Sequence, residues 1–450
     1  MECGPLDAAL DATCHLVTDS PGSNNQMSNT YAKHIGYLDL LRRNPKVRRL
    51  WMAQVVSELG DWLNFVALVQ IINHFTPNAQ AIGWLIVIQM IPMVVVGPFA
   101  GIIADRFNRC GVMIVADLVR AAIVLGYLTI DRPEELWRVY VLAALQFSVT
   151  AFFEPARAAL IPSLAEGDEL VASNALTSVT WSVMLALGGF LGGLITGFIN
   201  PTATFLIDFI SFIVSALLLI RLLSAGAIRH LEHKPESPHP PESGLGPALV
   251  FLAHRPQVLA AMLIKTGICI TAGGLWLLSV VYGQRVFPVG KEGALSVGLL
   301  YGVHGLGSIV GASLSSRMLR TGRPIHAMLW AFVLRTAFFY FWAKAGNLTV
   351  VSVAIIAATS CGALLWVLST TVLQELVPDQ IRGRIFSLEN SAMTFGMIVS
   401  TVLTGRALDI WHLTPQATTL WTAVAAAVVA VGWGWVTWRW EKWRRAKEYI

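Results

Sequence analysis

The sequence is poor in charged residues: Asp, Glu, Lys and Arg make up 13% of its 450 residues, whereas 55% are hydrophobic. Soluble globular proteins carry about 25% charged residues, so this composition excludes a protein whose whole surface faces water. Apolar runs of about 20 residues, long enough to cross a ~30 Å hydrocarbon core as a helix, recur along the chain. Backbone groups that face lipid must be hydrogen-bonded within their own segment. The sequence therefore predicts an all-α membrane protein.

Cysteine is also scarce, and the signatures of common enzymes are missing. The five cysteines show no CxxC or other metal-like spacing: Cys3, Cys14, Cys110, Cys269 and Cys361. The sequence contains no HExxH, no G-x-S-x-G and no glycine-rich phosphate loop. We therefore expect no metal, no cofactor and no enzymatic activity. Residues 1–35 lack a basic segment followed by an apolar core, so we expect no cleavable signal peptide there.

The apolar runs predict twelve transmembrane helices. Their approximate limits are 50–75, 80–104, 111–130, 138–160, 174–198, 202–223, 257–283, 293–316, 325–344, 347–374, 385–408 and 415–438. The longest break, 224–256, is rich in Pro, Ser, Glu and His, which indicates a cytoplasmic linker between two six-helix bundles at 48–223 and 257–440. We expect residues 1–47 to form a partly disordered cytoplasmic tail and residues 441–450 a basic one.

The two bundles are related in sequence. Trp62 in the first span corresponds to Trp276 in the seventh at an offset of 214 residues. Leu160–Pro162 corresponds to Leu376–Pro378 at an offset of 216 residues. A repeat of about half the membrane-spanning part predicts two pseudo-symmetric bundles around a central axis.

The basic residues are distributed unequally between the two sides of the predicted membrane. The side without the termini holds only Arg132, Arg138, Arg285, Lys291 and Lys344. Because positively charged loops stay inside, both termini are predicted to be cytoplasmic, in the inner cell membrane. The net charge of +5 fits this topology better than nucleic-acid binding. We expect a monomer whose partners are the lipid bilayer and a small-molecule solute.

The loop between the second and third predicted spans carries a motif. GIIADRFNRC at 101–110 resembles the signature G-x-x-x-D-R-x-G-R-[RK] of the major facilitator superfamily. The matching residues are Gly101, Asp105, Arg106 and Arg109. Asn108 and Cys110 depart from the signature.

Further stretches resemble the branch of this superfamily that contains the enterobactin and macrolide exporters, the transmembrane secretion effector group. Among them are LGDWL (59–63), PARAALIPSL (155–164) and LQELVPDQIRGRIFSL (373–388). The resemblance implies the major facilitator fold, alternating access and proton-driven export of small amphipathic molecules.

The fifth predicted span contains a glycine-rich stretch, LGGFLGGL. It resembles the antiporter motif G-P-x-x-G-G of exporter branches, with Gly188, Gly192 and Gly193 matching and Gly189 in the place of Pro. Paired small residues let helices approach closely. The stretch therefore serves helix packing alone or also sets the direction of transport.

Two acids stand in the first span, where burial in lipid would be most unfavourable. At 1.5 Å per residue from Leu50, Glu58 lies ~12 Å and Asp61 ~16 Å into the span. They share a sector of about 120° with three other polar residues, Gln54, Ser57 and Asn64. An acid that faces lipid costs at least ~2.5 kcal/mol, so we expect this stripe to face a water-accessible cavity. The pair is a candidate for proton coupling, unless Asp61 only hydrogen-bonds a neighbouring helix.

Three other titratable residues are weaker coupling candidates. Lys265 in the seventh span needs a buried partner, which is Glu58, Asp61 or Glu389, in a switchable or a permanent pair. Glu154 near the end of the fourth span is expected to pair with Arg157 or a loop rather than contact solute. His304 in the eighth span could titrate, but a lone histidine among glycines is more often hydrogen-bonded and silent.

Charged loop residues are predicted to form a conformational latch at the cytoplasmic boundary. The set is Gly101, Asp105, Arg106, Arg109, Asp117, Arg120, Arg382 and Arg384. Asp105 would lie against the positive amino end of the eleventh helix, a contact that must break when the cytoplasmic side opens. The alternative is that these arginines only control topology.

A set of aromatic and polar residues is predicted to line the solute cavity: Gln54, Trp62, Asn64, Phe147, Trp276, Trp366, Glu389 and Asn390. Together they suggest an amphipathic solute rather than a sugar or an inorganic ion. The sequence thus favours a secondary active exporter of a siderophore- or drug-like compound, coupled to H⁺ by antiport. An uncoupled facilitator, a lysolipid-like flippase and a non-transporting membrane sensor stay open as alternatives.

Overall fold

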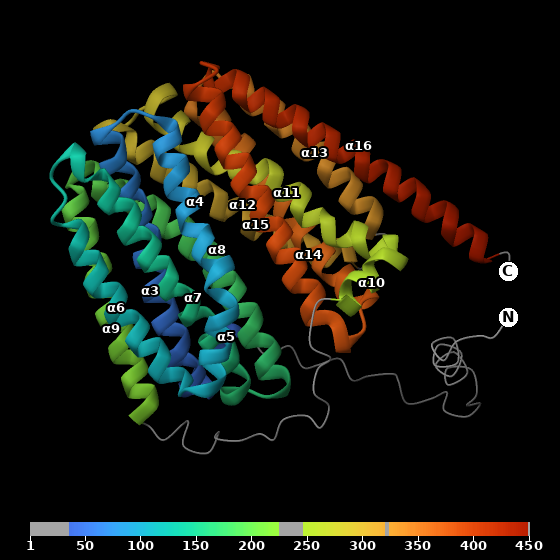
Figure 1. Cartoon of the computed structure of the whole chain (residues 1–450), viewed down its shortest axis with the longest axis horizontal. Helices are drawn as coiled ribbons and strands as arrows, with labels where there is room; N and C mark the ends of the chain where they lie inside the picture. Colours follow the sequence, from blue (N-terminus) through green and yellow to red (C-terminus); the bar gives the residue numbers. More distant parts are fainter. Residues whose placement is uncertain (1–35, 225–245, 320–323, 449–450) are drawn as a thin grey trace.

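The structure is a computed structural model that describes residues 36–224, 246–319 and 324–448. Within these ranges the chain is helical apart from short connections, and it contains no strand (Figure 1). Eleven helices in the described ranges are long and apolar enough to cross a membrane, which confirms the predicted all-α membrane architecture. In the first half these are α3 (Pro45–Phe75), α6 (Arg109–Tyr127), α7 (Leu136–Leu164), α8 (Gly167–Phe198) and α9 (Pro201–Ser224). In the second half they are α11 (Pro256–Val281), α12 (Ala294–Leu319), α13 (Pro324–Ala343), α14 (Leu348–Leu376), α15 (Asp379–Asp409) and α16 (Pro415–Glu448).

The second predicted span, 80–104, is broken into two helices. Helix α4 (Ala79–Val95) has 17 residues, and α5 (Gly97–Arg106) follows it after Val96. Prolines explain the break, because Pro92 lies inside α4 and another proline stands in the first turn of α5. The two helices together take the place of the predicted span.

Two short helices lie in regions predicted as tail and linker. Helix α2 (Tyr37–Arg43) buries Leu40 and Leu41 in a core cluster of the first half. Helix α10 (Gly246–His254), in the predicted linker, buries Ala248 and Leu252 in a cluster of the second half. The parts of these regions at 1–35 and 225–245 lie outside the described residues. The backbone of α16 continues as a helix to Glu448, through most of the predicted basic tail.

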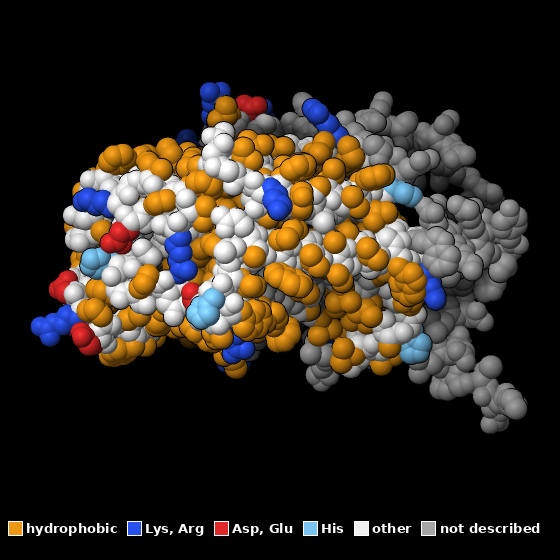
Figure 2. Space-filling view, turned by 90° about the horizontal axis from the view of Figure 1, so that it is seen from above, with side chains coloured by type: hydrophobic (Ala, Val, Ile, Leu, Met, Phe, Trp, Pro, Cys, Tyr) orange, Lys and Arg blue, Asp and Glu red, His pale blue; other side chains and the backbone are white. Residues whose placement is uncertain are grey.

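The helices form two halves, α3–α9 and α11–α16, whose ribbons approach each other at one end and separate toward the other (Figure 1). Within the first half α3 packs on α8 and α9, and within the second half α11 packs on α15. The halves meet chiefly where α8 packs on α12 and where α4 packs on α15. The end at which the ribbons approach, formed by the α3–α4 and α15–α16 connections, is called the closed end below. Seen from above (Figure 2), the molecule shows mainly hydrophobic side chains, with charged ones scattered singly among them.

The glycines of the antiporter-like stretch face two different partners. A Cβ atom on Gly193 would lie 2.7 Å from the carbonyl oxygen of Ala294 and 2.8 Å from the Cα atom of Gly298 on α12. Gly189 faces Tyr301 of α12 in the same way. Gly188 and Gly192 face α3 instead, where a Cβ on Gly188 would lie 2.6 Å from that of Trp62. The stretch therefore lets α8 approach its own half and the other half at once.

Candidate functional site

Aromatic side chains join the two halves near the middle of α3 and in the last third of α11. The rings of Trp62 and Trp276 stack with their centroids 5.9 Å apart and 14° between their planes. Trp181 of α8 packs edge-on against Trp62 at 6.0 Å. On the other side of the stack, Tyr301 of α12 lies 5.1 Å from Trp276. These rings leave little space between the halves at this level. Trp62 and Trp276, which were predicted to line the solute cavity, instead pack against each other between the halves.

Polar contacts join the halves at the closed end. The ring Nδ1 of His74, in the last turn of α3, lies 2.9 Å from an oxygen of Glu292. The backbone N–H of Gln80 donates to Asp409 at 2.6 Å. Arg285, which lies in the second half like Asp409, is 3.8 Å from the same carboxylate group and donates across the contact to the backbone carbonyl of Pro77. The contacts come from exposed or half-buried side chains, so each contributes at most about 1 kcal/mol.

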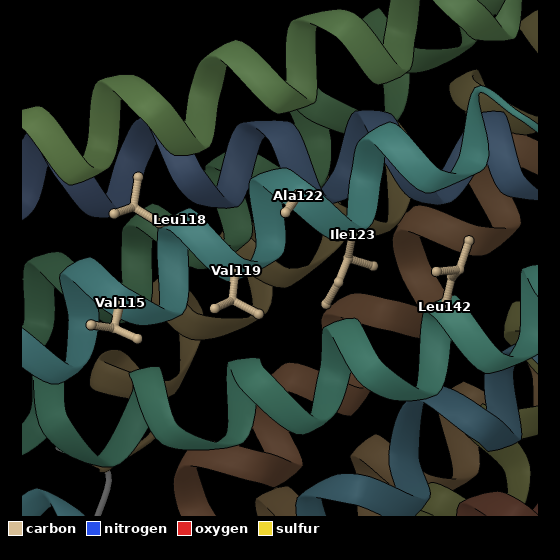
Figure 3. Close-up of a pocket in the computed structure, with 6 residues that line it drawn as sticks. All are labelled: Val115, Leu118, Val119, Ala122, Ile123 and Leu142. Carbon is tan, nitrogen blue, oxygen red and sulfur yellow. The ribbon is translucent and has the colours of Figure 1, made fainter.

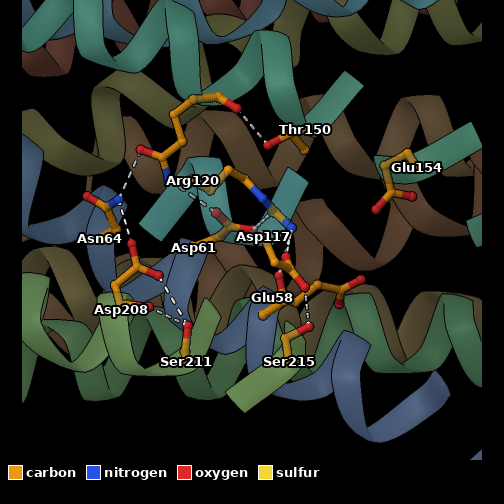
Figure 4. Close-up of polar contacts among 12 residues, drawn as sticks. Glu58, Asp61, Asn64, Asp117, Arg120, Thr150, Glu154, Asp208, Ser211 and Ser215 are labelled. Atoms are coloured by element: carbon orange, nitrogen blue, oxygen red, sulfur yellow. Dashed lines mark hydrogen bonds and ion pairs between the residues drawn. The ribbon is translucent and has the colours of Figure 1, made fainter. Parts of the chain in front are cut away.

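A buried charged network occupies the interior of the first half (Figure 4). Arg120 of α6 is 1% exposed and donates to Asp61 of α3 at 3.3 Å and to Ser57 at 3.2 Å. It also forms an ion pair with Asp117, one turn earlier on α6. Asp117 in turn accepts a hydrogen bond of 2.6 Å from Ser215 of α9. The Asp61 side chain stays 27% exposed, so it is the member of this group that solvent can reach.

Asp208 of α9 extends the network on the other side of Asp61. Its carboxylate accepts hydrogen bonds from Asn64 at 2.7 Å and from the hydroxyl of Ser211 at 3.3 Å. Gln146 of α7 links the two parts, because its amide donates to Asp61 at 3.4 Å and accepts from Asn64 at 3.2 Å. Among the described residues, this network therefore holds three carboxylates and one guanidinium, which pairs with Asp61 and Asp117 but not with Asp208.

Glu58 lies in a second, smaller group closer to the start of α3. Gln54 donates to one Glu58 oxygen at 2.8 Å, and the other oxygen has no hydrogen-bond partner among the described residues. Arg157 of α7 bonds Gln54 at 3.2 Å and pairs with Glu154 at 2.5 Å. The predicted pairing of Glu154 with Arg157 is confirmed. The sequence predicted that the polar stripe of α3 faces a cavity between the halves; instead it faces the interior of the first half, because the neighbouring helices supply partners for it.

Lys265 finds its partner within the second half. Its ammonium lies 3.0 Å from Glu389 of α15, and both side chains are nearly fully buried. The rings of Trp366 and Phe386 lie 4.9 and 5.7 Å from the ammonium group. Of the three predicted partners, the structure therefore selects Glu389 in the state described.

His304 is hydrogen-bonded on both ring nitrogens, as the sequence led us to expect. One nitrogen lies 2.9 Å from the hydroxyl of Ser279 and the other 3.1 Å from that of Thr359. The imidazole also stacks on Trp276 at 5.0 Å. The side chain thus supports the aromatic contact between the halves.

The residues of the predicted latch do not lie together in the structure. Asp117 and Arg120 were expected at the cytoplasmic boundary; this is wrong, because both are buried in the middle of the first half and pair there with α3 and α9. Arg109 does lie at the helix boundary, where it donates to the carbonyl of Ala159 at 2.8 Å. Arg382 donates to backbone carbonyls at the end of α14.

The remaining latch residues are less defined. Arg106 is exposed and Arg384 half-buried. The structure describes only the backbone at Gly101 and Asp105, so the predicted contact of Asp105 stays a prediction.

The other predicted cavity residues do not form one wall. Trp366 is 41% exposed, Asn390 is exposed and Phe147 is half-buried, whereas Asn64 and Gln54 are buried in hydrogen bonds of the first half. A groove of about 490 Å³ lies elsewhere, on the outer face of α6 and α7 (Figure 3). Its lining is wholly apolar: Val115, Leu118, Val119, Ala122, Ile123 and Leu142. In a membrane this face would contact lipid, so we do not assign it to the solute.

The sequence analysis did not place Gln146 or Asp208 among the site residues. Gln146 is the amide that connects Asp61 to Asn64, and its one signal was a polar residue inside the apolar run 138–160. Asp208 is fully buried with no ion-pair partner among the described residues. Within the described part of the chain, no cluster of three His, Cys, Asp or Glu side chains could hold a metal ion.

Comparison with known proteins agrees with this architecture. The chain is 24% identical over 371 residues to YfiS of Bacillus subtilis strain 168, an uncharacterized MFS-type transporter, covering 80% of this chain and 86% of YfiS. It is 26% identical over 379 residues to BacE of Bacillus amyloliquefaciens, a candidate bacilysin exporter, covering 80% and 88%. It is 25% identical over 384 residues to the enterobactin exporter EntS of Salmonella paratyphi A, covering 82% and 87%.

A solved structure shares the fold. An auto-inhibited peptide transporter of the POT family superposes with a TM-score of 0.68 at 12% identity, over 88% of this chain and 97% of that one. The sequence profile of the Major Facilitator Superfamily matches residues 50–325. The chain therefore belongs to the Major Facilitator Superfamily and is a multi-pass membrane transporter.

Proposed function

We propose that the protein exports a small amphipathic compound across the inner cell membrane by alternating access, in exchange for protons. Both termini lie in the cytoplasm in this proposal, so the closed end of the structure faces outward. The observation that carries the proposal is the network of three carboxylates with the single guanidinium of Arg120, beside the contact between the halves. The names of BacE and EntS as exporters support the direction of transport.

The arrangement of the halves supports alternating access. The Trp62–Trp276 stack, near the middle of α3, and the contacts of Asp409 and Glu292 at the closed end hold the halves together. These contacts are few and mostly solvent-exposed, so they can break without disrupting either bundle. Separation at this end and approach at the other would expose the space between the halves to the opposite side of the membrane.

The charge of the network supports proton coupling. If Asp61, Asp117 and Asp208 were all ionised, Arg120 would leave two negative charges uncompensated in a buried site. Burial and neighbouring like charges both favour the protonated form of a carboxyl group. Asp61 is the partly exposed member, so we assign the exchangeable proton to it; Gln146 and Asn64 connect it to Asp208 by hydrogen bonds.

The position of Asp61 on α3 links its charge to the contact between the halves. Asp61 precedes Trp62 directly, and Trp62 makes the stack with Trp276. A proton on Asp61 weakens its attraction to Arg120, which lets α3 shift relative to α6. Proton uptake by Asp61 and opening of the closed end are thereby coupled through the turn of α3 that carries Asp61 and Trp62.

The solute class follows from the side chains near this contact. Aromatic rings offer flat apolar surfaces, and Glu58, one turn before Trp62, offers a carboxylate with one oxygen free of hydrogen bonds in the described structure. A compound with an apolar body and a polar or cationic group matches both features.

Efflux from proteoliposomes tests the proposal. The purified protein is reconstituted, and efflux of enterobactin and of a fluorescent amphipathic dye is followed with and without an imposed pH gradient. We expect the gradient to accelerate efflux by the wild type and to have no effect on Asp61→Asn, with a reduced effect on Glu58→Gln. The matched control is Glu135→Gln, which removes an acid outside the network.

Two outcomes would contradict the proposal. Gradient-driven efflux by Asp61→Asn at the wild-type rate would refute the assignment of the proton. Efflux by the wild type that ignores the gradient would instead indicate an uncoupled facilitator or a flippase.

A further inference from the structure

Arg335 of α13 is a second buried arginine, and it lacks the partners that Arg120 has. Its side chain is 3% exposed. Its Nε and Nη1 atoms have no hydrogen-bond partner among the described residues, and Nη2 reaches only the carbonyl of Ile268, at 3.5 Å. No described carboxylate forms an ion pair with it. Glu389 pairs with Lys265 instead.

The groups near Arg335 that the structure describes are two thiols, an imidazole and an aromatic ring. The thiols of Cys269 on α11 and Cys361 on α14 lie close to the guanidinium, as does the imidazole of His304 on α12. The ring of Phe339 lies 5.3 Å from the guanidinium carbon. Cys361 is half-buried, so this side of the guanidinium is less enclosed than the others.

The repeat between the halves shows what is missing. Arg335 stands 215 positions after Arg120, so it takes the same place on the third helix of its bundle. Arg120 is compensated by acids on α3 and α6. The positions 214 and 215 residues after those acids, 275–276 and 331–332, hold only apolar residues. The second half therefore has a buried arginine at this place but no acidic residue at the positions that correspond to Asp61 and Asp117.

The Nη1 group of Arg335, which has no hydrogen-bond partner among the described residues, faces a glycine. This glycine is Gly362 of α14, and a Cβ atom at this position would lie 3.3 Å from Nη1 of Arg335. Glycine leaves that volume open on the side where the guanidinium has a free N–H group. Arginine keeps its charge in proteins, so burial cannot be relieved by loss of a proton.

We propose that Arg335 binds a small monovalent anionic group between α11, α13 and α14. A buried charge without a partner costs several kcal/mol, and an anion that accepts the free N–H groups removes most of that cost. The anionic group is either a free inorganic ion such as chloride or the carboxylate of an organic molecule. Binding at this site goes beyond the proposed export and requires no transport.

Thermal unfolding of the purified full-length protein tests the site. The melting temperature is measured at constant ionic strength in sodium sulfate, whose anion is divalent, with increasing chloride, nitrate, acetate or benzoate. A ligand that binds the folded state raises the melting temperature with its concentration, and we expect a saturating rise of about 2 °C or more. A rise with chloride and nitrate identifies an inorganic ion, and a rise with acetate or benzoate alone identifies a carboxylate.

Three variants decide whether Arg335 is responsible. Arg335→Gln should abolish the rise. Cys361→Asp, which supplies an internal carboxylate, should also abolish it while keeping the cation. Gly362→Ala should weaken the apparent affinity several-fold because the new methyl group narrows the space. Arg138→Gln, which removes an arginine that is already paired with Glu135, should leave the rise unchanged.

The proposal is overturned by either of two results. One is a wild-type melting temperature that is the same in all five anions. The other is a rise that persists in Cys361→Asp and keeps its wild-type concentration dependence in Gly362→Ala, which keeps the test decisive even when Arg335→Gln does not fold.

Discussion

Asp61 of α3 lies 3.3 Å from the guanidinium of Arg120 on α6. This ion pair places the most exposed carboxylate of the network next to the residue that stacks on the opposite half. The buried network of the first half therefore holds more carboxylates than guanidinium groups. In the second half the buried Lys265–Glu389 pair is balanced, and Arg335 has no carboxylate partner among the described residues.

Removal of Arg120 should destabilise the protein strongly. Arg120→Met leaves Asp61 and the buried Asp117 without their cation, and breaking a buried pair in this way costs about 3–5 kcal/mol. Arg120→Met/Asp117→Asn should recover part of that loss, since it removes one of the stranded charges. The melting temperature and the folded fraction in size-exclusion chromatography report both effects. Equal melting temperatures for Arg120→Met and the wild type would contradict a compensating role of the arginine.

The Lys265–Glu389 pair should behave as a unit. Lys265→Met strands Glu389, whose second oxygen already lacks a hydrogen-bond partner among the described residues, so we expect a large fall in melting temperature. Lys265→Met/Glu389→Gln removes both charges and should restore most of the stability. If the double variant is as unstable as the single one, the pair is not the main interaction of either residue.

A methyl group at Gly193 should open the closed end. Gly193→Ala places its Cβ within 2.8 Å of two atoms of α12, so α8 and α12 must separate. Gly197→Ala, one turn further along α8, is the matched control, because its Cβ would meet α12 at an ordinary 3.6 Å. Spin labels at Thr202 and Val289, measured by double electron–electron resonance, should show a longer distance in Gly193→Ala only. An unchanged distance distribution would show that the helices absorb the methyl group without separating.

The Trp62–Trp276 stack should stabilise the closed end by about 0.5–1.5 kcal/mol. Trp62→Ala and Trp276→Ala should each increase the population with a long distance between the same labels, by several-fold. The double variant should add little to either single variant, because the two rings contact each other. Trp411→Ala, at an exposed tryptophan beyond α15, serves as the control. Fully additive effects would mean that each ring acts through other neighbours.

Some features of the site could be predicted because they depend on residues close in the sequence. The i,i+3 spacing of Glu154 and Arg157 places their side chains on one helix face, and the structure shows them paired. The same spacing predicted the Asp117–Arg120 pair, but its position was predicted wrongly, at the boundary instead of the interior. A helix wheel shows which residues share a face and says nothing of the helix that this face will meet.

The sequence by itself determined the membrane class, the helices, the repeat and the superfamily, because low charge, long apolar runs and local motifs are properties of neighbouring residues. Only the tertiary structure decided that Arg120 pairs with Asp61 and that Lys265 pairs with Glu389. It also decided that Arg335 has no carboxylate partner among the described residues. These contacts join residues on different helices, 59 positions apart for Asp61 and Arg120 and 124 for Lys265 and Glu389. The packing of the helices sets which of the polar faces come together, and the balance of buried charge follows from that packing.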